Sequence, residues 1–292
     1  MNYNLRSLIL IFIYTEYMKS LALNLNFRKI KSISFDLTGT IFIHKEPIVE
    51  TYAEAAVWAK LKNSPSPEEL KPAFKQAFKE NSLNNAYYST SQDSSSSREW
   101  WKDTIKRTLE LCDRNYSEAD FNRYFRRIYQ HFGSPYGYEI LPDAIDFLNF
   151  LSKEYPDICL GITSNTPLRS IETVLPMLGL HKRFKYFVSC QEVRAEKPSR
   201  EIFEETYQQA SYWCDNNLNK DEVLHIGDNL ASDFCGAKAF GFQALLLDRS
   251  DNPRVNVYQD WLKAPDYSNK SVQDIENSTF KNFLDIKKHF LL

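Results

Sequence analysis

Charged and hydroxyl side chains stand at the points of this sequence where predicted strands end or a helix begins. They are Asp36, Ser164, Lys197, Asp228 and Asp233. Because burying an unpaired carboxylate is costly, Asp36 at the end of an apolar run needs a partner such as a metal ion or a phosphoryl group. The simpler alternative is a turn in which this Asp accepts hydrogen bonds from the next backbone amides.

The types of these side chains favour phosphoryl chemistry with magnesium. Mg²⁺ prefers hard oxygen ligands, so Asp36 and Asp228, with a backbone carbonyl near Thr38, predict a magnesium site. A cluster of acids without His or Cys argues against zinc. Lys197 and the Ser164 hydroxyl would hold phosphoryl oxygens and offset the charge that develops during transfer, which leaves Asp36 free to attack in line.

The elements that must position these residues alternate between strand and helix. Short apolar runs predict strands over 32–35, 158–163, 186–189, 223–226 and 243–247. Helical spacing between them predicts helices over 144–151, 168–178, 200–210 and 232–240. This alternation predicts an α/β fold with a Rossmann-like parallel sheet and helices on both faces. In such sheets the ligand site lies beyond the carboxyl ends of the strands, so the residues should converge on one crevice.

A block of amphipathic helices interrupts this pattern after the first strand. Helices are predicted over 46–61, 68–81, 98–111 and 117–129, with a polar loop over 89–97. No strand lies between them, so they predict an inserted helical cap. The expected organisation is an N-terminal extension (1–29), a core (30–44 and 140–250), a cap (45–139), and a tail (251–292) whose final helix spans 280–291.

The composition of the chain limits the classes of partner and the cellular compartments that we expect. The net charge of -2 gives no basic field for nucleic acid, and the apolar run over 8–14 is too short to span a membrane. Five cysteines without C-x-x-C spacing suit a reducing compartment, which predicts a cytoplasmic or nuclear protein. The N-terminal segment holds more basic residues than acidic ones, so a mitochondrial location is an alternative. Residues 21–27 alternate like a short edge strand, and nothing in the sequence indicates an oligomeric state.

The ordered set D-L-T-G-T, S-N, K-P and G-D-N-L-A-S-D resembles the four motifs of the haloacid dehalogenase-like hydrolase superfamily, from Ile30 to Arg249. The segments S-R-E-W-W and H-F-G-S-P-Y-G-Y-E-I-L-P also resemble a group within it, haloacid dehalogenase-like hydrolase domain-containing protein 3. The resemblance implies Mg²⁺-dependent hydrolysis of a small phosphorylated metabolite through an aspartyl-phosphate on Asp36.

The same resemblance assigns expected roles. The residues expected at the metal are Asp36, Thr38, Asp228 and Asp233. Those expected to act on or bind the phosphate are Ser164, Lys197, Thr40 and Asn165.

One position departs from the usual pattern of the superfamily. Its phosphatases carry D-x-D-x-T, whose second Asp is the general acid and base, whereas this chain has Thr38. Loss of general acid–base help costs about 10²- to 10⁴-fold in rate, so slow turnover is expected. A weak or inactive protein of the same fold with a binding or regulatory role is the alternative. A dehalogenase is less favoured, because it dispenses with metal while Asp228 and Asp233 are present.

Overall fold

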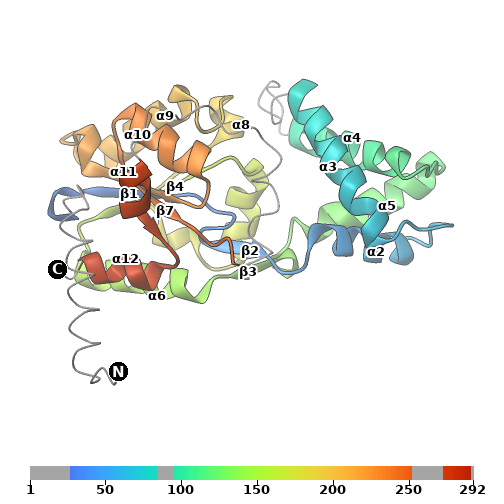
Figure 1. The fold of residues 1–292 in the computed structure, drawn as a ribbon, viewed down its shortest axis with the longest axis horizontal. Coiled ribbons are helices and arrows are strands. Elements are labelled where there is room, and N and C mark those ends of the chain that lie inside the picture. The colour runs from blue at the N-terminus through green and yellow to red at the C-terminus, as the bar shows by residue number, and fades with distance from the viewer. Residues whose placement is uncertain (1–26, 85–94, 252–271, 291–292) are drawn as a thin grey trace, which may run out of the picture.

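A six-stranded parallel sheet forms the core of the computed structural model, which describes residues 27–84, 95–251 and 272–290 (Figure 1). The strand order is β5-β4-β1-β6-β7-β8. The strands are β1 (Ser32–Phe35), β4 (Cys159–Ser164), β5 (Tyr186–Ser189), β6 (Val223–Gly227), β7 (Gln243–Leu247) and β8 (Thr279–Phe280). Since β1 pairs in parallel with both β4 and β6, the carboxyl ends of these three strands meet at one edge. The predicted α/β parallel-sheet fold is confirmed.

One face of the sheet is apolar and is covered by α6 (Pro142–Glu154) and α12 (Phe283–Phe290), as Figure 1 shows. Ile33 and Phe35 of β1 belong to this core cluster. The Phe147 ring of α6 stacks on the Phe283 ring of α12 at a centroid distance of 4.8 Å. The alternation of β1 therefore places every second residue against these two helices.

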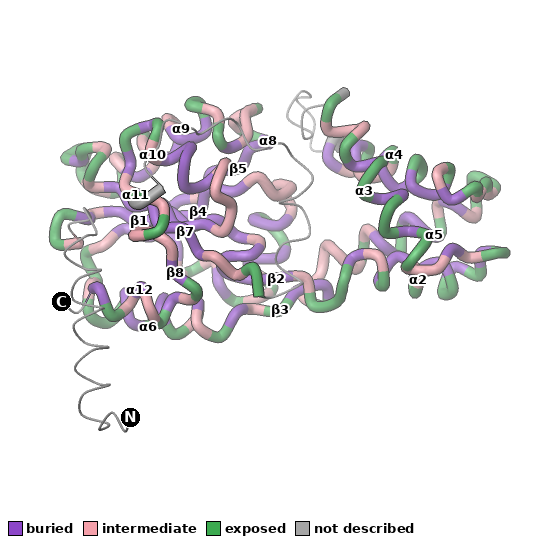
Figure 2. The backbone as a smooth tube through the Cα atoms, viewed as in Figure 1, coloured by how far each residue is buried: buried purple, intermediate pink, exposed green. Residues whose placement is uncertain are grey.

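The opposite face carries α8 (Cys190–Val193), α9 (Arg200–Trp213) and α10 (Gly236–Phe240). Phe203 of α9 stacks on Phe240 of α10, and Ser199 caps α9 by accepting a hydrogen bond from the amide of Glu201. Beneath α9 the sheet presents hydroxyl groups as well as apolar side chains, since Ser32 and Ser34 of β1 are completely buried. Figure 2 shows that the central strands are buried along their length.

Between β2 (Phe42–His44) and β3 (Tyr138–Ile140), the described part of the chain forms four helices, which lie beside the sheet in Figure 1. They are α2 (Ile48–Trp58), α3 (Pro67–Asn84), α4 (Ser95–Leu111) and α5 (Glu118–His131). Trp100 is buried among them and contacts the rings of Phe78 and Trp101. The strands β2 and β3 pair in antiparallel fashion, so the chain leaves and re-enters the core through a two-stranded ladder. The predicted boundary after residue 139 falls within β3.

Several predicted elements differ in the structure. The segment predicted as a helix over 168–178 contains a π-helix (η3, Ser170–Val174) and a short α7 (Leu175–Met177). A second π-helix (η6, Leu230–Cys235) precedes α10, so the helix predicted from residue 232 begins earlier. The last helix begins at Phe283 and not at residue 280, because Phe280 belongs to β8. Residues 95–97, predicted as loop, already belong to α4.

The remaining elements are short. They are η1 (Phe27–Lys29), η2 (Pro135–Gly137), η4 (His181–Arg183), η5 (Lys220–Glu222) and α11 (Val272–Asn277). The edge strand predicted over 21–27 lies outside the described residues except for Phe27, which is in η1. Among the described residues, no helix is both long and apolar enough for a membrane span.

Candidate active site

Asp36 is the first residue after β1 and lies at the centre of the sheet edge. Its side chain is buried, and its backbone amide donates to the carbonyl of Ile226 at 3.0 Å. The turn that follows passes through Gly39 with φ of +92°, where a Cβ would collide with the carboxylate of Asp228. Glycine at this position therefore allows both the turn and the close approach of a second acid.

Lys197 joins two of the predicted acids. Its Nζ donates to Oδ1 of Asp36 at 2.7 Å and forms an ion pair with Oδ1 of Asp233 at 2.6 Å. It also donates to the carbonyl of Thr163 at 2.8 Å. Burial disfavours the ammonium, but the two carboxylates outweigh that effect and raise the pKa of Lys197. The lysine is therefore held charged and in a fixed position.

Ser164 and Asn165 reach the site from the end of β4. The Ser164 hydroxyl donates to Oδ1 of Asp36 at 3.2 Å, which brings it to the predicted nucleophile. The Asn165 side chain instead holds the backbone of Lys197, accepting from its amide at 2.8 Å and donating to its carbonyl at 3.0 Å. The contact predicted between Asn165 and phosphate stays a prediction, and the structure adds that this amide fixes the lysine loop.

The carboxylates of Asp36, Asp228 and Asp233 gather closely enough to ligate one ion. Each offers one oxygen, and these oxygens lie within 4.8 Å of one another. Burial and the charges of the other two acids raise the pKa of Asp228 well above its ordinary value. Burial also raises the pKa of Asp36, although Lys197 opposes the shift. The single ammonium does not balance three acids, so hard oxygen donors with excess negative charge fit a divalent cation such as Mg²⁺.

Asp233 differs from the other two acids because it is well paired. Despite burial, Lys197 and His225 hold its pKa below the ordinary value. Its Oδ2 accepts a hydrogen bond from the Asn229 amide at 2.9 Å. A Cβ on Gly227 would collide with the Asp233 side chain, so the glycine that ends β6 makes room for this acid.

The two threonines of the turn are placed differently. Thr38 is half-buried and forms an isolated bridge with Phe42. Thr40 is completely buried, and its hydroxyl finds no hydrogen-bond partner among the described residues. The ligand role predicted for Thr38 and the phosphate contact predicted for Thr40 stay predictions.

His225 is a site residue that the sequence motifs do not predict, and it contacts the buried side of Asp233. Its Nε2 lies 3.1 Å from Oδ1 of Asp233, and its Nδ1 lies 3.1 Å from Oγ of Ser34. The Ser34 hydroxyl donates to Thr163 at 2.8 Å, and Thr163 lies 2.8 Å from the Thr206 hydroxyl of α9. A histidine within an otherwise apolar strand, opposite a serine of β1, was the available sequence signal.

Two substitutions of His225 should separate its two hydrogen bonds. Glutamine places an amide near the Nε2 position, whereas asparagine reaches only the Nδ1 position. We expect His225→Asn to lower the free energy of unfolding by about 1–3 kcal/mol, because it removes a hydrogen bond to the buried, charged Oδ1 of Asp233 and leaves Lys197 as the partner of that oxygen, and His225→Gln to lower it less. Urea unfolding measures both values. Equal losses in the two variants would mean that the bond to Asp233 contributes nothing specific.

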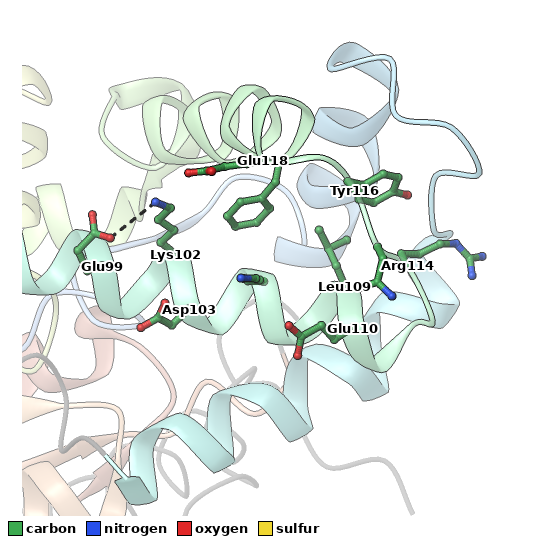
Figure 3. Close-up of a pocket in the computed structure, with 11 residues that line it drawn as sticks. Glu99, Lys102, Asp103, Leu109, Glu110, Arg114, Tyr116 and Glu118 are labelled. Carbon is green, nitrogen blue, oxygen red and sulfur yellow. Dashed lines mark ion pairs between the residues drawn. The ribbon is translucent and has the colours of Figure 1, made fainter.

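A pocket of about 280 Å³ lies elsewhere, between α4 and α5 (Figure 3). Its walls carry both signs of charge, and Lys102 faces Glu99 across an ion pair of 3.9 Å. Leu109 and Phe121 supply apolar contacts. None of the residues predicted for phosphoryl chemistry lines this pocket, so it is separate from the carboxylate cluster.

Comparison with known proteins gives concordant matches. The haloacid dehalogenase-like hydrolase family model matches residues 30–241. The chain is 27% identical over 225 residues to haloacid dehalogenase-like hydrolase domain-containing protein 3 of Mus musculus, covering 76% of this chain and 84% of that protein. It is 25% identical over 226 residues to the rhythmically expressed gene 2 protein of Drosophila melanogaster, covering 75% and 83%.

Solved structures share the fold. The magnesium-bound HAD-hydrolase YfnB of Bacillus subtilis superposes with a TM-score of 0.57 at 14% identity, over 90% of this chain and 99% of that one. The L-2-haloacid dehalogenase of Xanthobacter autotrophicus gives 0.57 at 20% identity, over 89% and 97%. At these identities the likeness supports the architecture alone.

Proposed function

The chain belongs to the haloacid dehalogenase-like hydrolase family, and on that premise we propose that it is a Mg²⁺-dependent phosphatase acting on a small phosphorylated metabolite. The observation that carries the proposal is the cluster of Asp36, Asp228 and Asp233 around the ammonium of Lys197. This arrangement offers ligands for a cation and a fixed positive charge for an anionic substrate.

Asp36 is the proposed nucleophile, and its two carboxylate oxygens differ in their hydrogen bonding. Oδ1 accepts hydrogen bonds from Lys197 and Ser164. Within the described residues, Oδ2 accepts no hydrogen bond, so it is the oxygen free to attack phosphorus. The new Oδ2–P bond forms as the bond to the leaving oxygen breaks, and water then hydrolyses the aspartyl-phosphate to release phosphate and regenerate Asp36.

The remaining residues bind charge and hold position. Lys197 and the Ser164 hydroxyl lie beside Oδ1 of Asp36, where they can donate to phosphoryl oxygens as charge develops. Asp228 and Asp233, with Asp36 and the carbonyl of Thr38, would hold Mg²⁺. Bound there, the ion supplies positive charge that orients the phosphoryl group and offsets its negative charge.

Thr38 sets the expected rate and substrate class. A hydroxyl that does not titrate near neutral pH cannot protonate a leaving alkoxide, so esters whose alcohols leave readily should be favoured. An aryl phosphate such as p-nitrophenyl phosphate is therefore the appropriate first substrate. Trapping a beryllium fluoride adduct at Asp36 with Mg²⁺ present, observed by fluorine NMR, tests the phosphoryl-binding geometry without requiring turnover.

Removal of Mg²⁺ should reduce phosphate release to background and should also lower stability. At a Mg²⁺ concentration of 100 times Kd, binding stabilises the fold by about 2.7 kcal/mol. We therefore expect the midpoint of thermal unfolding to rise with Mg²⁺ and to return to its starting value with EDTA. The Asp228→Asn variant should lose this response, whereas Asp221→Asn, at an exposed position outside the cluster, should keep it. A midpoint that does not respond to Mg²⁺ would contradict the proposed metal site.

The same assays separate the alternatives. A binding or regulatory protein, which Thr38 favours, would form the fluoride adduct but release no phosphate from any ester tested. A dehalogenase would release halide from a 2-haloacid in the presence of EDTA. Either result would replace the phosphatase proposal.

A further inference from the structure

Two cysteines lie together at the edge of the sheet opposite the carboxylate cluster. Cys159 is the first residue of β4, and Cys214 ends α9 as its C-cap. Both are held by the carbonyl of Lys31. The Cys159 amide donates to that oxygen at 2.9 Å, and the Cys214 thiol donates to it at 3.8 Å.

The two thiols also interact directly, and they are not equivalent. A hydrogen bond between their side chains raises the pKa of Cys159 and lowers the pKa of Cys214. The ammonium of Lys31 favours the thiolate at Cys214 further. Cys214 is therefore the more acidic of the two thiols.

Cys214 also differs from the other cysteines in its exposure to solvent. Cys214 is partly exposed, whereas the other four cysteines are buried. Burial raises the pKa of Cys112 and of Cys190, which keeps these thiols protonated. Cys214 therefore combines solvent access with the lower pKa of the pair, and Cys159 lies beside it at the same Lys31 carbonyl.

We propose that Cys159 and Cys214 are a site of reversible oxidation, at which a peroxide converts the two thiols to an intramolecular disulfide. The Cys214 thiolate attacks one peroxide oxygen, the O–O bond breaks, and the departing hydroxide takes up a proton to form water. The sulfur of Cys159 loses its proton and attacks the resulting sulfenic acid. The S–S bond forms as the S–O bond breaks, and a second water leaves.

The bridge would tie β4, which ends at the active-site residue Ser164, to α9, which follows the lysine loop. The strand β4 begins at Cys159 and ends at Ser164, and α9 begins three residues after Lys197 and ends next to Cys214. The disulfide joins the far ends of this pair and restricts the unfolded chain, so oxidation should raise the midpoint of thermal unfolding. The proposal does not depend on the phosphatase activity.

Peroxide titration of the reduced full-length protein tests the site. Of the five thiols, two should be lost, and peptide mapping by mass spectrometry should find a cross-link between the peptides that contain Cys159 and Cys214. Dithiothreitol should restore all five thiols and the original unfolding midpoint.

Three variants make the assignment specific. Cys214→Ser should leave Cys159 reduced, whereas Cys159→Ser should stop at a sulfenic acid on Cys214 that dimedone labels. Cys190→Ser, which removes a buried thiol elsewhere, should cross-link as the unmodified protein does. The proposal would be overturned if the unmodified protein lost thiols at other cysteines first, or if Cys214 were oxidised to sulfinic acid without a cross-link.

Discussion

The Asp36→Asn variant should release phosphate from p-nitrophenyl phosphate about 10⁴-fold more slowly than the unmodified protein, or slower still, since loss of a nucleophile has effects of that order. Asparagine keeps the shape of the side chain but has no anionic oxygen to attack phosphorus. Because the Asp36 carboxylate is buried, its neutral replacement also lessens a desolvation cost. Lys197 keeps Asp233 as its partner, so the fold should survive the change.

Steady-state rates with saturating Mg²⁺ measure this effect, and thermal unfolding verifies that the variant is folded. Asp221→Asn makes the same chemical change at an exposed position in η5, before β6 begins, and it should leave the rate unchanged. Identical rates for Asp36→Asn and the unmodified protein would rule out the proposed nucleophile.

The Thr38→Asp variant should gain about 10²- to 10⁴-fold in turnover on esters with poor leaving groups. Position 38 lies two residues beyond Asp36 in the same turn and is half-buried, so a carboxyl there would be close to the reacting group. In its protonated form it can donate to the leaving oxygen, and once ionised it can accept a proton from the attacking water. The gain should be smaller for p-nitrophenyl phosphate, whose leaving group needs little protonation.

The dependence of kcat on pH provides the matching signature. The Asp variant should acquire a titration that the threonine protein lacks, because activity then requires a particular protonation state of residue 38. Thr38→Asn supplies a polar side chain of similar size without an acid and should show neither the gain nor the titration. If the Asp variant were no faster than the Asn variant, the absent acid would not be what limits turnover.

The convergence of the site could be predicted from the sequence because one rule governs it. Strands of a parallel sheet end at the same edge, so polar residues after apolar runs must meet there. Asp36 and Ser164 meet by this rule, and Lys197 joins them from the loop before α9. What the pattern could not provide was which side chain holds which. Asn165 binds the Lys197 backbone, a contact that depends on two loops far apart in the chain.

The errors in the fold prediction involve short or non-local elements. Strands β2, β3 and β8 contain two or three residues each, and each is held by pairing with a distant segment rather than by its own pattern. Residue spacing predicts an ordinary helix where η6 is a π-helix, because spacing does not reveal an extra residue per turn. Asn229 sets its start by accepting hydrogen bonds from the amides of Ala231 and Ser232.

His225 was missed because its partners are revealed only when β1 and β6 lie side by side. The alternation S-I-S-F in β1 places a serine hydroxyl on the same face as this histidine. The alternating serines therefore indicated a polar layer inside the sheet, a signal that apolar-run arguments overlook.

This polar layer connects side chains from five elements, which are η6, β6, β1, β4 and α9. Asp233, His225, Ser34, Thr163 and Thr206 form one continuous series of buried contacts. Replacing one of these residues by an apolar residue leaves a buried polar group of its neighbour without that hydrogen bond. Replacing two adjacent residues together removes the donor and the acceptor at once. The stability effects of Ser34→Ala and Thr163→Val should thus be strongly non-additive. In related sequences, a substitution at one of these five positions should therefore be accompanied by a substitution at a neighbouring position of the layer.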